Sequence, residues 1–378
     1  MSKTSIGLDI GTRAVRAVEV KGSPGHESVV RFGRVLMPAG AMDHGEVQNP
    51  AAVAEAIQTL WKRLRVPGKA VHVGIANRRV VVRVIELPAM SDEDLKSAIK
   101  LQAQDHIPIP LSEAVMDYEV LERVDSADGQ PVQRVLVVAA ERASVMPLLE
   151  AVKMAKLEAR SLELNAYPLV RCLGDGSSDA EAIVDIGAGV TTVVIHVGGR
   201  IRFTRILPNF GGDDFTAAVA EGLGVSLEEA EPMKRHAAGD LASRMTDGDE
   251  GPAPVAPSFV DGAVAATTET MTAVDAPVRT VAELIEPVRQ RFVSEVRGSV
   301  DFYSSQPGAA NVGRVVLTGG GSMLGGLSDA LSNALGITAE IGHPFARVPM
   351  GHMNVSSDQT NVAERYMSVA VGLALAGS

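Results

Sequence analysis

The sequence predicts an α/β protein built from two related halves that face a shared cleft. The first observation is a strand-turn-strand run at residues 5–20, and the second is an echo of that run at residues 182–197. The third is a buried-type strand at residues 315–318 that ends in a run of three glycines. One supersecondary unit that recurs at the start of each half indicates a duplicated architecture.

Each of the two repeats brings an aspartate to a glycine turn. Asp9 precedes Gly11 in the first repeat, and Asp185 precedes Gly187 in the second. Glycine lets the backbone approach a ligand closely, so that several N–H groups converge on a phosphate while the carboxylate faces its Mg²⁺. A single such hairpin is also ordinary turn chemistry. The pair predicts one polyphosphate held from both sides.

The overall composition narrows the function classes. With 378 residues, 46% hydrophobic and 21% charged, the chain is long and apolar enough for two or more folded domains. A net charge of −11 argues against a nucleic-acid partner. Cys172 is the single cysteine, which excludes an intrachain disulfide and suits a reducing cytoplasm. We find no secretory signal and no apolar run of the ~18 residues that a membrane span needs, so we expect no direct membrane insertion.

The opening hairpin continues into a third strand at residues 28–37. Asn49 is a typical helix N-cap, and Pro50 suits the first position of the helix that follows. Two more strands are expected at residues 71–76 and 80–87. We expect all five strands to form one open mixed sheet that is covered by the helix on one face.

From residue 88 the pattern changes to a compact αββα insertion of roughly 70 residues, near the lower size limit for a module with its own core. Ser91 caps the first helix, with Asp94 as the third helical residue. Pro108 and Pro110 end that helix. The remaining elements are two strands and a helix, at residues 116–124, 133–141 and 144–155.

A strand at residues 158–164 returns the chain to the first half, and a short helix follows at residues 167–173. The second half then repeats the three-strand opening. Its other expected elements are helices at residues 213–221, 227–236, 281–303, 323–335 and 362–375, the strand at residues 315–318, and a short strand near Ala339. Residues 240–280 are rich in Asp, Gly, Pro, Ala and Thr without periodicity, which predicts a mobile loop.

Paired Asp-x-Gly hairpins, a late glycine triplet and a closing helix resemble the superfamily of actin, sugar kinases and heat-shock chaperone ATPases. The segment from Leu87 to Lys100, with His106-Ile-Pro-Ile-Pro and Asp117-Tyr-Glu-Val-Leu, is similar to the PilM family of type IV pilus assembly proteins, relatives of the division protein FtsA. The resemblance implies an actin-like two-lobed fold of duplicated ribonuclease-H-like domains, with an FtsA-type 1C insertion.

The resemblance also implies a domain division. It gives domain 1A as residues 1–87, 158–180 and 360–378, the inserted domain 1C as 88–157, domain 2A as 181–239 and 308–359, and domain 2B as 240–307 with the mobile loop at 240–280.

Carried over by motif, the resemblance implies an ATP and Mg²⁺ site. Asp9 and Asp185 would face the metal. The remaining nucleotide contacts would be Gly11, Thr12, Arg13, Gly187, Ala188, Gly189, Gly211, Gly212, Glu231, Lys234, Gly319, Gly320, Gly321 and Ser322. For Glu231 and Lys234, an exposed pair on a solvated helix is the competing interpretation.

At one position the sequence departs from the family pattern in a way that affects ATP hydrolysis. At Asn165 the family often has a glutamate, and the corresponding group in related ATPases orients the attacking water. An amide holds a water but cannot take its proton, so we expect at most weak ATPase activity unless Asp185 compensates.

The implied partner is the cytoplasmic N-terminal tail of a PilN-like inner-membrane protein. The prolines at 108 and 110 and the strand edges of the insertion are the candidate surfaces for it, as an added strand or in a groove. The resemblance also implies a homo-oligomer, either a ring or a filament, and a cytoplasmic location at the inner face of the plasma membrane through the partner.

Two alternatives stay open. An FtsA-like division filament is one, although the chain ends in Gly-Leu-Ala-Leu-Ala-Gly-Ser378 without the basic amphipathic helix of FtsA. A small-molecule kinase is the other, although no further catalytic aspartate stands out between the motifs. A related secretion system also fits in place of a pilus.

Overall fold

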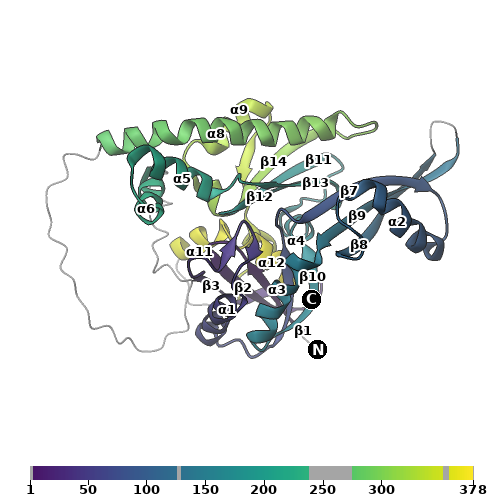
Figure 1. Ribbon diagram of the computed structural model, residues 1–378, viewed down its shortest axis with the longest axis horizontal. Coiled ribbons are helices and arrows are strands. Elements are labelled where there is room, and N and C mark those ends of the chain that lie inside the picture. The colour runs from purple at the N-terminus through teal and green to yellow at the C-terminus, as the bar shows by residue number, and fades with distance from the viewer. Residues whose placement is uncertain (1–2, 126–128, 238–274, 352–356, 378) are drawn as a thin grey trace.

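The computed structural model describes residues 3–125, 129–237, 275–351 and 357–377. It has two stacked lobes, and a smaller module projects from one end (Figure 1). Each lobe contains a five-stranded mixed sheet, and the two sheets have the same strand order. The order is β10-β6-β1-β2-β3 in the first lobe and β15-β14-β11-β12-β13, read in the same sense, in the second. The predicted duplication is therefore present in the topology itself.

The first lobe is built on the opening hairpin. Helices α1 and α3 pack against each other beside its sheet, while α12 packs on β1 and β2 and against α4. Its strands are β1 (Lys3–Ile10), β2 (Ala14–Gly22), β3 (Ser28–Leu36), β6 (Ala70–Ile75) and β10 (Glu158–Leu164), with the small pair β4 (Met42–Asp43) and β5 (Glu46–Val47). Its helices are α1 (Pro50–Leu64), α3 (Arg142–Met154), α4 (Ala166–Leu173), α10 (Pro344–Arg347), α11 (Ser357–Glu364) and α12 (Ser368–Leu375).

The close approach of α12 to the rest of its lobe depends on glycine. A Cβ on Gly7 of β1 would lie 2.0 Å from the carbonyl oxygen of Ala370, and one on Gly372 would lie 1.9 Å from that of Pro168. A larger residue at either position forces the backbone apart. The C-terminal helix is thereby seated at the base of the cleft.

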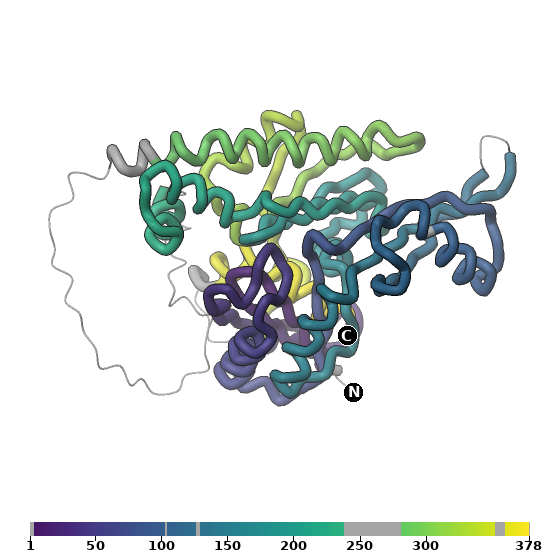
Figure 2. The backbone as a smooth tube through the Cα atoms, in the orientation of Figure 1, coloured from purple at the N-terminus to yellow at the C-terminus, as the bar shows by residue number. Residues whose placement is uncertain are grey.

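The second lobe repeats the arrangement with its own hydrophobic core. Its strands are β11 (Ala180–Ile186), β12 (Val190–Val197), β13 (Arg200–Pro208), β14 (Val312–Thr318) and β15 (Ala339–Ile341). Its helical elements are α5 (Gly212–Leu223), α6 (Leu227–Ala237), α8 (Asp275–Ser304), η1 (Gly320–Met323) and α9 (Leu327–Leu335). Helix α8 runs along the outer side of this lobe (Figure 2).

The projecting module is a three-stranded sheet of order β7-β9-β8 with one helix and a separate core. Its elements are β7 (Val80–Pro88), α2 (Asp92–His106), β8 (Ala114–Asp125) and β9 (Pro131–Glu141). The prediction that residues 80–87 join the first sheet is wrong, because β7 pairs with β9 along its whole length. Helix α3, predicted as part of the insertion, packs on α1 in the first lobe.

Three predicted helix boundaries also need correction. The helix expected from residue 323 is a 3₁₀ turn followed by α9, because Gly326 takes a left-handed φ of 72° between them. The single helix expected at residues 362–375 is two helices, α11 and α12. The loop predicted at residues 240–280 lies outside the described residues as far as residue 274, and α8 begins at Asp275.

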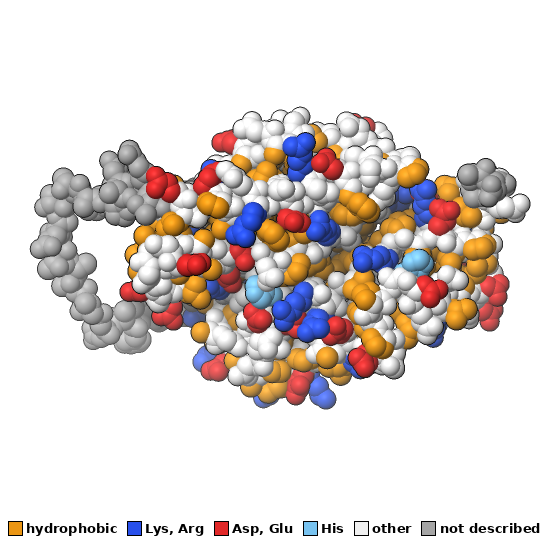
Figure 3. Space-filling model, turned by 45° about the horizontal axis from the view of Figure 1, so that its top comes forward, with side chains coloured by type: hydrophobic (Ala, Val, Ile, Leu, Met, Phe, Trp, Pro, Cys, Tyr) orange, Lys and Arg blue, Asp and Glu red, His pale blue; other side chains and the backbone are white. Residues whose placement is uncertain are grey.

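The subdomain boundaries remain a proposal, and the pairing of β7 favours an inserted module that begins near Val80. On the face drawn in Figure 3, basic and acidic side chains are interspersed rather than gathered into a patch of one sign. Within the described residues, no helix is both long and apolar enough to cross a membrane.

Candidate functional site

The glycine turns of the two hairpins meet between the lobes, at the ends of β1 and β11. They line a cavity of about 70 Å³, together with the turn after β14. Ten of the predicted nucleotide contacts lie on its wall: Asp9, Gly11, Thr12, Arg13, Asp185, Gly187, Ala188, Gly189, Gly319 and Gly320. Both hairpins and the late glycine turn therefore contribute to one site, as the repeat predicts.

A second cavity of about 110 Å³ adjoins the first and shares five wall residues with it. It adds four more of the predicted residues: Gly212, Gly321, Glu231 and Lys234. Two predicted residues line neither cavity. Gly211 donates its N–H to Asp214 at 2.7 Å, and the Ser322 hydroxyl donates to the carbonyl oxygen of Gly319 at 2.7 Å. Both hydrogen bonds stabilise the backbone of the turns.

The two aspartates differ in their surroundings. Burial raises the pKa of Asp9, against the opposing effect of Arg16, whose Nη1 donates to its Oδ2 at 2.9 Å. Burial and the nearby charge of Asp9 raise the pKa of Asp185 to about 7, despite Arg16. Without a ligand the site thus holds one ion-paired carboxylate and one that titrates near neutral pH.

Arg16 is the functional candidate that the sequence reasoning missed. It is the cross-strand partner of Asp9, and it also lies near the Tyr366 ring, 5.6 Å from the centroid. It lines both cavities. The signal was available, because residue i + 7 across a tight hairpin faces the aspartate, and Thr192 occupies that place opposite Asp185.

Contacts between the lobes close the cleft over the first cavity. Arg13 Nε donates to Asp213 Oδ1 at 2.8 Å, and His44 Nδ1 hydrogen-bonds to the carbonyl oxygen of Gly189 at 2.9 Å. Within the first lobe, the Thr12 hydroxyl accepts the N–H of Gly45 at 3.2 Å. A cavity of about 70 Å³ is far smaller than the 300–1,000 Å³ typical of ligand pockets. A ligand of ordinary size would therefore enter only after the contacts between the lobes open.

Lys234 and Glu231 form a buried brace rather than a solvated pair. The Lys234 ammonium donates to Gly212 O at 2.9 Å, to Thr216 Oγ1 at 2.8 Å and to Glu231 Oε2 at 2.8 Å. Burial raises the pKa of Glu231, but Lys234 outweighs that effect and the pKa is about 2. All three ammonium hydrogens are used, so the pair ties α6 to the start of α5 at the wall of the second cavity.

Asn165 also lies on the wall of the first cavity. Its Oδ1 atom is buried and has no hydrogen-bond partner in the described part of the chain. A Cβ on Gly74 would lie 2.3 Å from that oxygen, so the neighbouring backbone leaves room for the amide. A buried acceptor without a partner is costly, and a water or ligand donor in the cavity would satisfy it.

The sequence matches two families of known proteins. A profile of the family described as type IV pilus assembly protein PilM matches residues 7–245, and one for cell division protein FtsA matches residues 182–372. FtsA of Escherichia coli K12 is 23% identical over 98% of this chain and 89% of its own length. FtsA of Neisseria meningitidis serogroup B is 25% identical over 89% and 83%, respectively.

Solved structures agree with these matches. A chain of the "PilM-PilN type IV pilus biogenesis complex" superimposes with a TM-score of 0.80, at 27% identity over 99% of this chain and 98% of that one. Ethanolamine utilization protein EutJ from Carboxydothermus hydrogenoformans gives a TM-score of 0.55 at 15% identity, over 99% and 89%, which is a likeness of fold alone.

Proposed function

This chain belongs to the family of the type IV pilus assembly protein PilM, with an actin-like fold, and on that premise we propose that it is an ATP-binding scaffold of type IV pilus or related secretion machinery. In this proposal it binds the cytoplasmic N-terminal tail of a PilN-like inner-membrane protein. That tail holds it at the inner face of the plasma membrane. The solved PilM-PilN complex, to which the chain is similar over nearly its whole length, supports a partner of this kind.

The observation that carries the nucleotide proposal is the meeting of both aspartate-glycine turns in one cavity. The glycine turns of both hairpins line that cavity together with Arg13 and Arg16, and turn N–H groups and guanidinium groups are the donors that a polyphosphate needs. In this proposal the turn at Gly319 to Gly321 and the wall formed by Lys234 and Glu231 receive the nucleoside.

The carboxylates suit Mg²⁺ in the way that nucleotide sites hold it. Within the described residues, no group of three or more His, Cys, Asp or Glu side chains is placed to hold a metal by itself. Mg²⁺ is commonly held by one or two carboxylates together with phosphate oxygens and water. Asp9 and Asp185 would supply those carboxylates, and the bound ion would neutralise the phosphates.

Hydrolysis, if present, is slow in this proposal. Asn165 lies at the cavity with a free acceptor oxygen, and an amide positions a water without accepting its proton. Asp185, with a pKa of about 7, is the carboxylate on this wall best matched to accept a proton at neutral pH.

The test is a calorimetric titration with a synthetic PilN-like N-terminal peptide, carried out with and without Mg²⁺ and a non-hydrolysable ATP analogue. We expect the analogue to change peptide affinity at least about fivefold, since a ligand shifts a conformation only by its differential affinity. Asp9→Ala should abolish both nucleotide binding and this change. Glu55→Ala removes an exposed carboxylate on α1 and serves as the matched control.

The outcomes separate the parts of the proposal. If the nucleotide analogue leaves the peptide affinity of the wild-type chain unchanged, the coupling between the two sites is ruled out. A wild-type chain that binds no nucleotide rules out the cofactor, and one that binds no peptide rules out the partner. Assembly into a ring or a filament stays a separate prediction, to be measured by sedimentation.

An FtsA-like division filament is the second candidate, favoured by the FtsA profile match over residues 182–372. It predicts that the protein pellets with liposomes by itself. The scaffold proposal predicts that it stays in the supernatant until the membrane partner is added.

A further inference from the structure

A row of charged side chains crosses three neighbouring strands of the first lobe at the cleft. Asp9 of β1 is the cross-strand partner of Arg16 of β2, and Arg16 is in turn the partner of Arg34 of β3. The row therefore contains two cations and one carboxylate. At the same register the second lobe has, in order, Asp185, Thr192 and Ile206. The excess positive charge thus belongs to the first lobe alone.

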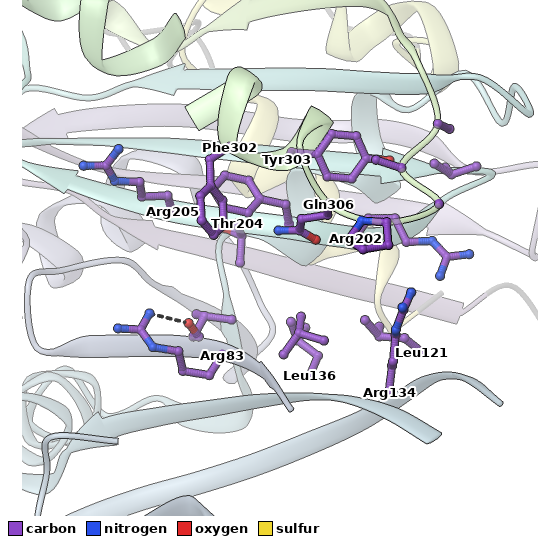
Figure 4. A pocket seen from close by; sticks show the side chains of 18 of the residues that line it. Arg83, Leu121, Arg134, Leu136, Arg202, Thr204, Arg205, Phe302, Tyr303 and Gln306 are labelled. Atoms are coloured by element: carbon purple, nitrogen blue, oxygen red, sulfur yellow. Dashed lines mark hydrogen bonds between the residues drawn. The ribbon is translucent and has the colours of Figure 1, made fainter. Parts of the chain in front are cut away.

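The arginines of another cavity show a different balance of charge. That cavity, of about 930 Å³, lies between the projecting module and the second lobe, and Figure 4 shows Arg134 and Arg202 on its opposite walls. These two side chains contact Glu122 at 3.0 and 2.7 Å, and Arg205 lies 2.9 Å from Glu295. Because these three cations already have carboxylate partners, the row in the cleft is the better candidate for recognising an anion.

The ring of Tyr366 contacts both arginines of the row. Tyr366 lies on the turn between α11 and α12 and is 5% exposed. Its ring centroid lies 5.6 Å from the Cζ atom of Arg16 and 4.9 Å from that of Arg34. A guanidinium over an aromatic face at this range is attracted to the ring, more strongly where water is excluded. Because like charges on facing strands repel, the ring offsets a repulsion that the two arginines would otherwise carry.

Arg16 keeps N–H donors for a ligand in this arrangement. Its Nη1 donates to Asp9 Oδ2 at 2.9 Å, and a Cβ on Gly11 would lie 2.9 Å from the same nitrogen. Its Nε is buried and has no hydrogen-bond partner in the described part of the chain, so a ligand or water is expected to meet it. Attraction to an aromatic face uses none of the guanidinium N–H donors. The ring can therefore hold Arg16 beside the glycine turn while these donors bind an anion.

The turn that carries Tyr366 is fixed where the two lobes meet. Thr318 is the last residue of β14 in the second lobe, and its hydroxyl lies 2.7 Å from that of Ser368, with both groups buried. Tyr366 lines the first cavity of the cleft, Arg34 lines the second, and Arg16 lines both. The support of Arg16 by the ring therefore depends on contacts from both lobes.

We propose that Tyr366 and Arg34 are positioning residues for the nucleotide site, which hold Arg16 at the phosphates once Asp9 serves the metal. In the free protein Asp9 pairs with Arg16. When that carboxylate faces a metal instead, the ring contact remains, because it needs no carboxylate. Arg34 repels Arg16 from the side of β3 and so directs it toward the turn at Gly11. This inference rests on the proposed function and deepens it, since it assigns residues outside the phosphate turns.

The first test measures the affinity of the full chain for a fluorescent, non-hydrolysable ATP analogue with Mg²⁺ by fluorescence anisotropy. Tyr366→Leu should weaken binding at least about tenfold, whereas Tyr366→Phe, which keeps the ring face, should stay within about twofold of the wild type. Arg34→Met should weaken it about threefold or more. Tyr118→Leu makes the same change on β8 of the projecting module, as the matched control, and should have no effect. Circular dichroism melts confirm that each variant is folded.

A double-mutant cycle separates positioning from a general structural role. Arg16→Met should itself weaken binding of the analogue. In that background, Tyr366→Leu should change the affinity by less than about twofold, because the ring acts through Arg16. A ring that only supports the fold would weaken binding equally in both backgrounds.

A second readout needs no nucleotide. In the chain labelled with ¹⁵N-arginine, the NMR signal of the Arg16 Nε–H group is identified by its absence from Arg16→Met. Because an aromatic ring shifts the resonances of protons near its face, this signal should move in Tyr366→Leu. It should stay close to its wild-type position in Tyr366→Phe.

The outcomes distinguish this inference from the proposed function. A wild-type chain that binds no analogue refutes the proposed function and this inference with it. If the wild-type chain binds the analogue and Tyr366→Leu binds it as tightly, only the positioning role is overturned. Equal losses in both backgrounds of the cycle, or an unmoved Arg16 signal, overturn it as well. A loss in Tyr366→Phe as large as that in Tyr366→Leu assigns the effect to the hydroxyl and rejects the ring contact.

Discussion

The two hairpins at the cleft share one topology but differ in the residue that lies opposite the aspartate. In the first lobe Asp9 faces Arg16, and in the second lobe Asp185 faces Thr192, at the same register. As a result Asp9 is ion-paired, while the pKa of Asp185 is raised to about 7 by burial and by Asp9. At this register the two hairpins therefore place one permanent cation beside two carboxylates.

This asymmetry assigns different roles to the two lobes. The first lobe pairs its carboxylate with the permanent cation of Arg16. The second lobe holds a carboxylate whose charge depends on pH and on any cation that enters the cleft. Substitutions that alter the charges of one lobe at a time test this assignment.

The largest effect is expected from Arg16→Thr, which makes the first hairpin resemble the second. The loss leaves Asp9 buried without its cation, so we expect the free energy of unfolding to fall by about 2–4 kcal/mol at pH 8, because breaking a buried pair is costly. Urea denaturation measures it. The double variant Arg16→Thr with Asp9→Asn should recover most of the loss, and no recovery would mean that Arg16 stabilises through other contacts.

The next effect compares the same substitution in both hairpins. The folded-state pKa of Asp185 lies above its unfolded value, so its ionisation lowers stability as pH rises from about 4 to about 7 and stays unfavourable above that. Asp185→Asn should therefore raise the unfolding free energy at pH 8, by about 1–3 kcal/mol, and leave it unchanged at pH 4. Asp9→Asn should give a smaller gain at pH 8, because Arg16 offsets part of the burial cost of Asp9 and loses its partner in this variant. Equal shifts in both variants would refute the asymmetry.

A smaller effect concerns protons released on binding. Mg²⁺ with an ATP analogue should favour the ionised form of Asp185, whose raised pKa of about 7 leaves the carboxyl partly protonated at neutral pH. We expect the release of a fraction of a proton per site, measured by calorimetry in buffers of different ionisation enthalpy. Asp185→Asn should abolish the release. An unchanged release in that variant would assign it to another group.

The smallest effect is expected from the ion pair of Arg13 and Asp213, which links the two lobes. Arg13 and Asp213 are partly exposed, at 49% and 25% of their side chains, so Asp213→Asn should change stability by no more than about 1 kcal/mol. Because that ion pair closes the cleft, the same variant should bind nucleotide faster in stopped-flow measurements. The gain should shrink in high salt, where the wild-type pair is already screened.

Local pattern was enough to predict the lobes and the turns, because each hairpin is specified by its own residues. The capped start of α1 at Asn49 follows from a motif that is contiguous in the sequence. The same holds for the ten predicted nucleotide contacts on the wall of the first cavity. The placement of β7 was not predictable in this way, since its residues fit either sheet and only long-range pairing decides between them.

The contacts that separate the two aspartates were also beyond the motifs. The pairing of Asp9 with Arg16 depends on hairpin register, and the buried brace of Lys234 depends on the packing of α6 against α5. Arg13 reaches Asp213 only because the lobes close on each other. Sequence patterns locate the glycine turns, and tertiary packing sets the charges around them.

A crystal structure of the chain with Mg²⁺ and a non-hydrolysable ATP analogue would show whether the two glycine turns hold one nucleotide. We predict phosphates between the turns at Gly11 and Gly187, with Arg16 at a phosphate oxygen and both Asp9 and Asp185 facing the metal. An analogue bound elsewhere, or a cleft still clasped by Arg13 and Asp213 at saturating nucleotide, would contradict it.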